Sequence, residues 1–114
     1  MKRSAIVAAL VIAGAGLAYA QSSFDGVYRA PAGGIAGNGR CGSTKFGFPL
    51  RVSGGRANLH TNTYGDFEGP VGPDGSVNIQ QGSNVLVGRI AGSRFDGTLN
   101  LGRTGCGYTL QYSK

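Results

Sequence analysis

Residues 46–61 read FGFPLRVSGGRANLHT, and this stretch decides the fold. In its first half, every second position carries a large apolar side chain, while Gly, Pro and Arg stand between them. A period of two places such side chains on one face of a β-strand. A Ser-Gly-Gly-Arg turn follows at residues 53–56, and residues 57–61 form the expected return strand. The stretch therefore predicts an antiparallel hairpin.

The same alternation continues in short segments to the end of the chain, and no helical period appears after residue 20. Turn signals such as Pro73-Asp74-Gly75 separate the segments, because Pro presets φ and Gly accepts a positive φ. We expect an all-β fold, an antiparallel meander of about eight short strands closed as a small barrel, with a β-sandwich as the alternative. The expected strands cover residues 24–29, 46–52, 57–61, 67–71, 77–79, 85–90, 95–99 and 106–112.

The beginning of the chain differs from the rest. Two basic residues precede an apolar run over residues 5–17, and Ala18-Tyr19-Ala20 ends the segment. This order is typical of a secretory signal peptide, and the run is shorter than the ~20 residues that span a bilayer. We expect a helical signal peptide at residues 1–20 and a single β domain at residues 21–114. The mature protein is expected to be periplasmic or secreted, with no membrane span after cleavage.

Composition narrows the range of functions. The 114 residues suffice for one small domain, and they include 22 Gly, one His, two Cys and no Trp. With one His, two Cys and five acidic residues, the chain has few side chains that could act in catalysis or bind a metal. Loss of the two basic leader residues lowers the net charge from +6 to +4, and the remaining Lys and Arg are scattered singly. We expect a monomer that is not an enzyme, holds no cofactor or metal and binds no nucleic acid.

The chain has two cysteines, Cys41 and Cys106, and both lie in the part expected to be exported. An even number of cysteines in a small exported domain predicts a disulfide bond. A structural bond is favoured, because a catalytic dithiol would have the spacing C-x-x-C. The bond would hold the Gly-rich loop at residues 30–40 against the last strand. This loop is the candidate contact segment, with an uninvolved flexible connection as the alternative. Its candidate contact residues are Gly33, Gly34, Ile35, Asn38 and Arg40.

A motif of Phe, acid, Gly, any residue and an apolar residue occurs at residues 24–28, 67–71 and 95–99. On a strand, Phe and Gly share one face and the acid lies on the other. We expect an aromatic ring from a neighbouring strand to cover the bare glycine, which also lets the sheet coil. The repeat residues are Phe24, Gly26, Phe67, Gly69, Phe95 and Gly97.

The three acids of the repeat are candidates for acid–base chemistry, but the pattern places them on the solvent face. The expected role is structural, because exposed cross-strand ion pairs contribute only a few tenths of a kcal/mol. His60 lies among polar residues and is expected to be an exposed histidine rather than a metal ligand. The acids are Asp25, Glu68 and Asp96, and the arginines expected on the same face are Arg29, Arg51 and Arg89.

Several motifs together resemble one group of proteins. They are Phe-Asp-Gly-Val-Tyr at residues 24–28, Val-Ser-Gly-Gly at 52–55, Pro-Asp-Gly at 73–75, Gly-Arg-Ile at 88–90 and Cys-Gly-Tyr-Thr-Leu at 106–110. The chain resembles small exported β proteins of unknown function from alphaproteobacteria, over nearly all of its mature length, and this resemblance implies no activity. It is also faintly similar to exported metalloprotease inhibitors, which are eight-stranded barrels with one disulfide. The core Trp of that family is missing here, and its Cys spacing is shorter.

These features favour a non-enzymatic exported β domain that presents loops to a macromolecule of the cell envelope or exterior. One alternative is an inhibitor of an exported hydrolase of the protease or lysozyme type, with residues 21–23 or the loop at 30–40 in the enzyme's cleft. The other is a small-ligand barrel with a partly empty interior. Aromatic side chains are expected to fill that interior. They are Phe24, Tyr28, Phe46, Phe48, Phe67, Phe95, Tyr108 and Tyr112.

Overall fold

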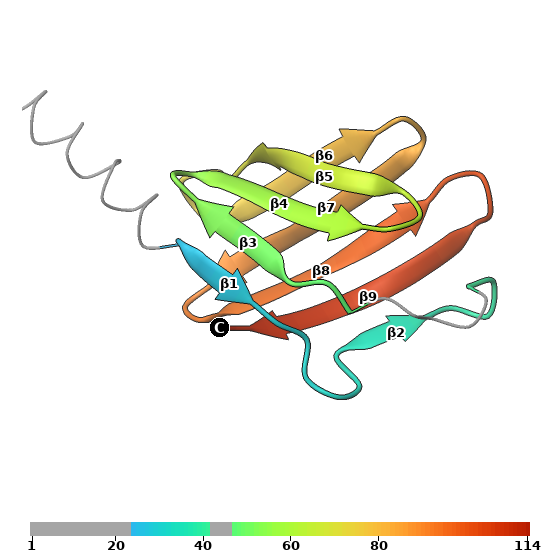
Figure 1. Ribbon diagram of the computed structural model, residues 1–114, viewed down its shortest axis with the longest axis horizontal. Helices are drawn as coiled ribbons and strands as arrows, with labels where there is room; N and C mark the ends of the chain where they lie inside the picture. The colour runs from blue at the N-terminus through green and yellow to red at the C-terminus, as the bar shows by residue number, and fades with distance from the viewer. Residues whose placement is uncertain (1–23, 42–46) are drawn as a thin grey trace, which may run out of the picture.

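The computed structural model describes residues 24–41 and 47–114 (Figure 1). The expected signal peptide at residues 1–20, the segment at 21–23 and Phe46 lie outside the described residues.

The described residues form nine β-strands in two antiparallel sheets. One sheet has the order β1-β3-β4-β5, and the other has the order β2-β9-β8-β7-β6. From β3 to β9 the chain runs as a meander in which each strand follows its neighbour in sequence. The strands are β1 Gly26–Tyr28, β2 Ile35–Gly37, β3 Leu50–Ser53, β4 Arg56–Thr61, β5 Gly65–Pro70, β6 Ser76–Gln81, β7 Asn84–Ala91, β8 Arg94–Leu101 and β9 Cys106–Ser113.

The two sheets overlap as the layers of a small sandwich (Figure 1). Single bridges join them at two corners, Arg29 with Ser113 and Val71 with Val77. No continuous ladder closes either corner in the described part of the chain. One physical reason is that Pro70, the last residue of β5, has no N–H to donate. The all-β antiparallel meander is thus confirmed, while the expected barrel closure is wrong and the β-sandwich alternative describes the fold.

Two local expectations differ from the structure. The strand expected at residues 46–52 begins at Leu50 as β3, directly after Pro49, which cannot donate to a ladder. The loop expected at residues 30–40 contains the short strand β2, antiparallel to β9. Glycine has low strand propensity, so a distant strand rather than local sequence fixes this segment.

The core lies between the two sheets, as the alternation predicts. In β4, β5 and β6, buried and exposed residues alternate almost without interruption. The aromatic side chains of Tyr28, Phe67, Phe95 and Tyr112 are at most 1% exposed. The rings of Phe95 and Tyr112 meet edge to face, with 6.2 Å between their centroids. Three further aromatic residues expected inside are half-buried, namely Phe24, Phe48 and Tyr108.

A pair of glycines marks the centre of the five-stranded sheet. Gly88 of β7 lies directly opposite Gly97 of β8. A Cβ atom on Gly88 would lie 2.6 Å from Cζ of Phe95, and one on Gly97 would lie 2.8 Å from the same atom. The Phe95 ring therefore covers both bare backbones, and no side chain larger than hydrogen fits beneath it.

The other two copies of the repeat fill the space over their glycines differently. At Gly69 the neighbouring atom is Cγ1 of Ile79, 2.8 Å from a Cβ position. At Gly26 it is Cδ of Lys114, at 2.9 Å, and the φ of +151° also disfavours a side chain.

We expect Gly88→Ala to destabilise the protein by roughly 1–3 kcal/mol, because the added methyl group must displace the Phe95 ring or the backbone. Urea unfolding followed by circular dichroism measures the loss. Gly39→Ala is the matched control, since no atom lies within 4 Å of its Cβ position. The control should stay within about 0.5 kcal/mol of the wild type. Equal stability of both variants would contradict the proposed role of the ring.

Burial also gives the fold a defined response to alkali. It raises the pKa of Tyr112 to about 12, from an ordinary value of 10.0. The phenol stays neutral in the folded state, so its contribution to stability is complete below pH 10 and is lost as the pH rises to about 12. We expect the stability of the wild type to fall more steeply over this range than that of Tyr112→Phe. Parallel stability curves for the two proteins would refute this assignment.

Candidate functional site

The structure contains the expected disulfide bond between Cys41 and Cys106, whose Cα atoms lie 4.7 Å apart. Cys106 is the first residue of β9 and is buried in the core, while Cys41 is half-buried. The bond fastens the end of the Gly-rich segment to the first residue of β9.

The candidate contact residues divide into two groups. Gly33 lies exposed at a turn with φ of +78°, and nothing occupies the 4 Å around its Cβ position. Gly34 is buried, and its carbonyl accepts a hydrogen bond of 2.7 Å from the N–H of Gln111. Ile35 packs against the core from β2. This half of the loop is thus part of the sheet.

The other two contact residues, Asn38 and Arg40, lie against the turn between β8 and β9. The side-chain amide of Asn38 donates to the carbonyl of Gly105 (3.1 Å), and its Oδ1 atom accepts from the backbone N–H of Arg40 (3.0 Å). The Arg40 side chain lies over Gly105, where a Cβ atom would be 3.1 Å from Nη1. Gly105 has φ of +70°, a backbone conformation that favours glycine.

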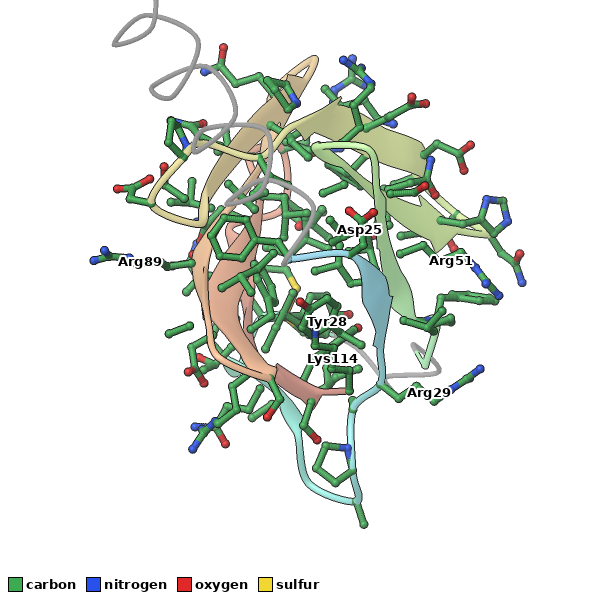
Figure 2. The ribbon with its side chains drawn as sticks, turned by 90° about the vertical axis from the view of Figure 1, so that its left-hand side faces the viewer. Asp25, Tyr28, Arg29, Arg51, Arg89 and Lys114 are labelled. Carbon is green, nitrogen blue, oxygen red and sulfur yellow. A yellow bond between two sulfur atoms is a disulfide. The ribbon has the colours of Figure 1, made fainter. Side chains whose placement is uncertain are left out.

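The repeat acids Asp25, Glu68 and Asp96 are all exposed. The arginines expected on the solvent face, Arg29, Arg51 and Arg89, are exposed as well. Figure 2 shows Arg29 and Arg89 directed away from the core on opposite sides of the sandwich. Acid–base catalysis by paired carboxyl groups uses a buried, apolar setting for one of them, and these exposed positions do not provide it.

His60 also lies on the surface, as expected. Its Nδ1 atom is hydrogen-bonded to the carboxylate of Asp66, directly opposite on β5. Its ring meets Phe48 edge to face, with 5.5 Å between centroids. Within residues 24–41 and 47–114, no three His, Cys, Asp or Glu side chains are grouped to hold a metal ion.

A different place in the molecule gathers functional groups. Because the chain runs as a meander, the turns after β4, β6 and β8 all lie at one end of the sandwich, on the right in Figure 1. We call this the hairpin end. It comprises residues 62–64, 82–83 and 102–105, together with the neighbouring segment 38–41.

The three turns enclose an open hollow of about 360 Å³, the turn pocket. Its volume lies at the lower end of the roughly 300–1,000 Å³ that is usual for ligand pockets. Leu101, which is 2% exposed, and the half-buried Tyr64 ring give it an apolar part. The lining residues are Tyr64, Gln81, Gly82, Ser83, Asn84, Leu101, Arg103 and Thr104.

Three polar side chains of the turn pocket are held by hydrogen bonds, and each keeps a further donor or acceptor that these bonds do not use. Nε2 of Gln81 donates to the carbonyl of Asp66 (2.6 Å), which leaves Oε1 as an acceptor. Oδ1 of Asn84 accepts from the N–H of Gly102 (3.3 Å), which leaves the amide N–H groups as donors. Oγ1 of Thr104 accepts from the N–H of Cys106 (3.2 Å), which leaves its hydroxyl proton to donate. The pocket therefore offers fixed donors and acceptors together.

Two cations stand at this end without a counter-charge. Arg103 lines the turn pocket and Arg40 lies over the same β8–β9 turn. In the part of the chain that the structure describes, neither side chain forms a hydrogen bond or ion pair with a carboxylate. Arg40 and Arg103 thus bring two positive charges to the β8–β9 turn, and such charges attract anions.

All five acidic residues of the chain have partners other than Arg40 and Arg103, including Asp66, which lies at the start of β5 two residues after Tyr64. Glu68 pairs with Arg56 (3.4 Å) and Asp96 with Arg94 (3.2 Å). The carboxylates of the other three, Asp25, Asp66 and Asp74, are bonded to the N–H of Gly54, to His60 and to Ser76. The side-chain and backbone hydrogen bonds of Ser76 lower the pKa of Asp74.

A second hollow, of about 250 Å³, differs in chemistry. It is lined by Pro31, Arg94, Gln111, Tyr112 and Ser113. Its cation Arg94 is neutralised by Asp96, and its Tyr112 hydroxyl donates to the carbonyl of Phe48 (3.0 Å). The turn pocket is the better candidate site because its charged residue, Arg103, forms no ion pair with a carboxylate among the described residues.

No protein-family model, curated protein or solved structure matches this chain. Among the described residues, no helix has the length and apolar character needed to cross a membrane.

Sequence reasoning proposed Asn38 and Arg40 as contact residues, and the structure places both at the hairpin end, but sequence reasoning did not find the turn pocket. The order of the predicted strands could have indicated that these turns lie together, since every second turn of a meander lies at the same end. Tyr64, Asn84 and Thr104 follow one another at an interval of one complete hairpin. Which turn residues line a common hollow depends on how the two sheets pack, and the local pattern does not contain that information.

Replacing both cysteines by serine should lower the free energy of unfolding by about 4 kcal/mol in the chain-entropy description. The bond spans a sequence separation of 65, so its loss greatly enlarges the unfolded ensemble. Guanidinium unfolding of the oxidised wild type, the reduced wild type and the double variant measures the effect. The last two should agree with each other. A double variant as stable as the oxidised protein would contradict the prediction.

Proposed function

We propose that this chain is an exported, non-enzymatic binding domain whose hairpin end receives a macromolecule of the cell envelope or exterior. The observation that carries the proposal is the turn pocket. It combines an apolar wall, partly unused hydrogen-bonding groups and an arginine without a counter-charge at one end of a rigid sandwich. Loops and turns on a rigid scaffold are where binding residues are concentrated.

The interior of the sandwich supports a surface site over an enclosed one. Large side chains from both sheets occupy the space between them, including the rings of Tyr28, Phe67 and Phe95. The turn pocket, in contrast, is open to solvent and bounded by three turns. A macromolecule can reach such a site with one of its residues while the rest of it extends beyond the pocket.

The chemistry of the surface supports binding over catalysis. The pair of His60 and Asp66 is exposed, and within the described residues no hydroxyl or thiol is hydrogen-bonded to the imidazole. A nucleophile activated by histidine requires such a contact. The turn pocket contains neither a histidine nor a carboxylate.

Export is supported by the disulfide bond and by the leader-like sequence. Disulfide bonds persist in the periplasm and outside the cell and are rare in the cytosol. The apolar run over residues 5–17 with its Ala-x-Ala end is the sequence feature that would direct export.

Capture from a native envelope extract tests the proposal. The tagged wild type should retain a component that Arg103→Glu retains at least tenfold less, because the charge is reversed at the edge of the turn pocket. The control Arg51→Glu makes the same charge change on the exposed face of β3 and should capture as the wild type does. Mass spectrometry identifies the component and shows whether it is recovered intact.

Three results would overturn the proposal. The first is no retained component with the wild type. The second is equal loss with both variants, which would mean that only net charge matters. The third is chemical conversion of the retained component, which would make the protein an enzyme.

A further inference from the structure

We infer that the turn pocket binds a carboxylated sugar residue of an acidic polysaccharide. This inference rests on the proposed function and specifies its ligand.

The apolar part of the turn pocket fits one face of a sugar ring. Tyr64 is half-buried and packs against the core, which holds its ring in place. Leu101 lies buried beside it at the end of β8. A pyranose presents C–H groups on one face and hydroxyl groups at its rim. It can therefore cover apolar surface while its polar groups remain hydrogen-bonded.

The polar part of the turn pocket requires a ligand that both donates and accepts. Oε1 of Gln81 is an acceptor, whereas the amide of Asn84 and the hydroxyl of Thr104 provide donors. Neighbouring hydroxyl groups of a sugar satisfy both kinds at once. A sulfate ion only accepts hydrogen bonds, so it would leave the Gln81 oxygen without a donor.

The charge of the hairpin end calls for an acidic sugar rather than a neutral one. The Arg103 guanidinium presents paired N–H donors, which match the two oxygens of a carboxylate. A neutral sugar would leave this cation uncompensated. Arg40 lies over Gly105, the residue that follows Thr104 of the pocket lining. A polymer with repeated carboxylates can contact both arginines, whereas a single sugar acid contacts one.

Titration calorimetry with defined probes tests the inference. The probes are short oligomers of galacturonate, mannuronate and a glucuronate-containing glycan, together with a methyl-esterified oligogalacturonate and inorganic sulfate. At least one of the three acidic oligomers should bind, and its affinity should fall as salt is added. The methyl ester keeps the rings and hydroxyls but lacks the charge, so it should bind about tenfold more weakly or not at all.

Two variants of equal charge locate the site. Arg103→Gln should weaken binding of the oligomer by about tenfold, since it removes the charged donor pair. Arg51→Gln removes one positive charge from the face of β3 and should change the affinity less than twofold. Both side chains are exposed, so unfolding curves should match the wild type.

The inference is overturned if none of the three acidic oligomers binds, if the methyl ester binds as tightly as the acid, or if sulfate competes as well as the oligomer. It is also overturned if the two variants weaken binding equally. These failures differ from failure of the proposed function. Capture that depends on Arg103 while no acidic oligomer binds would retain the binding domain and reject its ligand class. Capture that ignores Arg103 would reject both.

Discussion

The register of the antiparallel strands from β3 to β9 is the constraint on which the other features depend. A shift by one residue would turn each inward side chain to the solvent, because side chains alternate with a period of two. The buried rings of Phe67 and Phe95 and the opposed pair Gly88 and Gly97 hold that register at the centre of the sandwich. With the register fixed, alternate turns must lie at opposite ends. The turn pocket is therefore a consequence of packing in the core, even though all its polar residues are near the surface.

The distribution of charge follows from the same geometry. The acidic residues are exposed, and cations, a histidine or N–H and O–H groups contact them; of the five, Asp66 lies beside the hairpin end, where it is bonded to His60. Arg40 and Arg103 are held near the β8–β9 turn, the first by the disulfide next to it and the second by the turn itself. Surface ion pairs contribute little to stability, so the arrangement matters mainly for what the protein attracts. Two positive charges are thus held together at the β8–β9 turn beside the turn pocket.

Sequence alone was sufficient for the all-β class, for most strands and for the disulfide, because each depends on a local pattern or on a simple count. The period of two located β4 to β9 within a few residues of their observed bounds. It did not locate β2, since Ile35 and its neighbours are held by pairing with β9 rather than by their own preference. The choice between barrel and sandwich depends on whether continuous β-ladders join the edge strands of the two sheets. The sequence of a single segment does not contain this information. The turn pocket was missed for the same reason, because its residues meet only when the sheets are packed.

The two ends of the sandwich differ in structure. At the end opposite the hairpin end, Nζ of Lys114 donates to the carbonyl of Asp25 (3.0 Å) and lies 5.3 Å from the centre of the Tyr28 ring. Figure 2 looks onto this end and shows Lys114 beside Tyr28 in the opening between the sheets. The last residue of the chain thus covers the core there, and the described chain also begins at this end. At the hairpin end, the turn pocket is open to solvent. A partner bound there would meet three turns fixed by strands on both sides, so little ordering of the protein would be needed on binding.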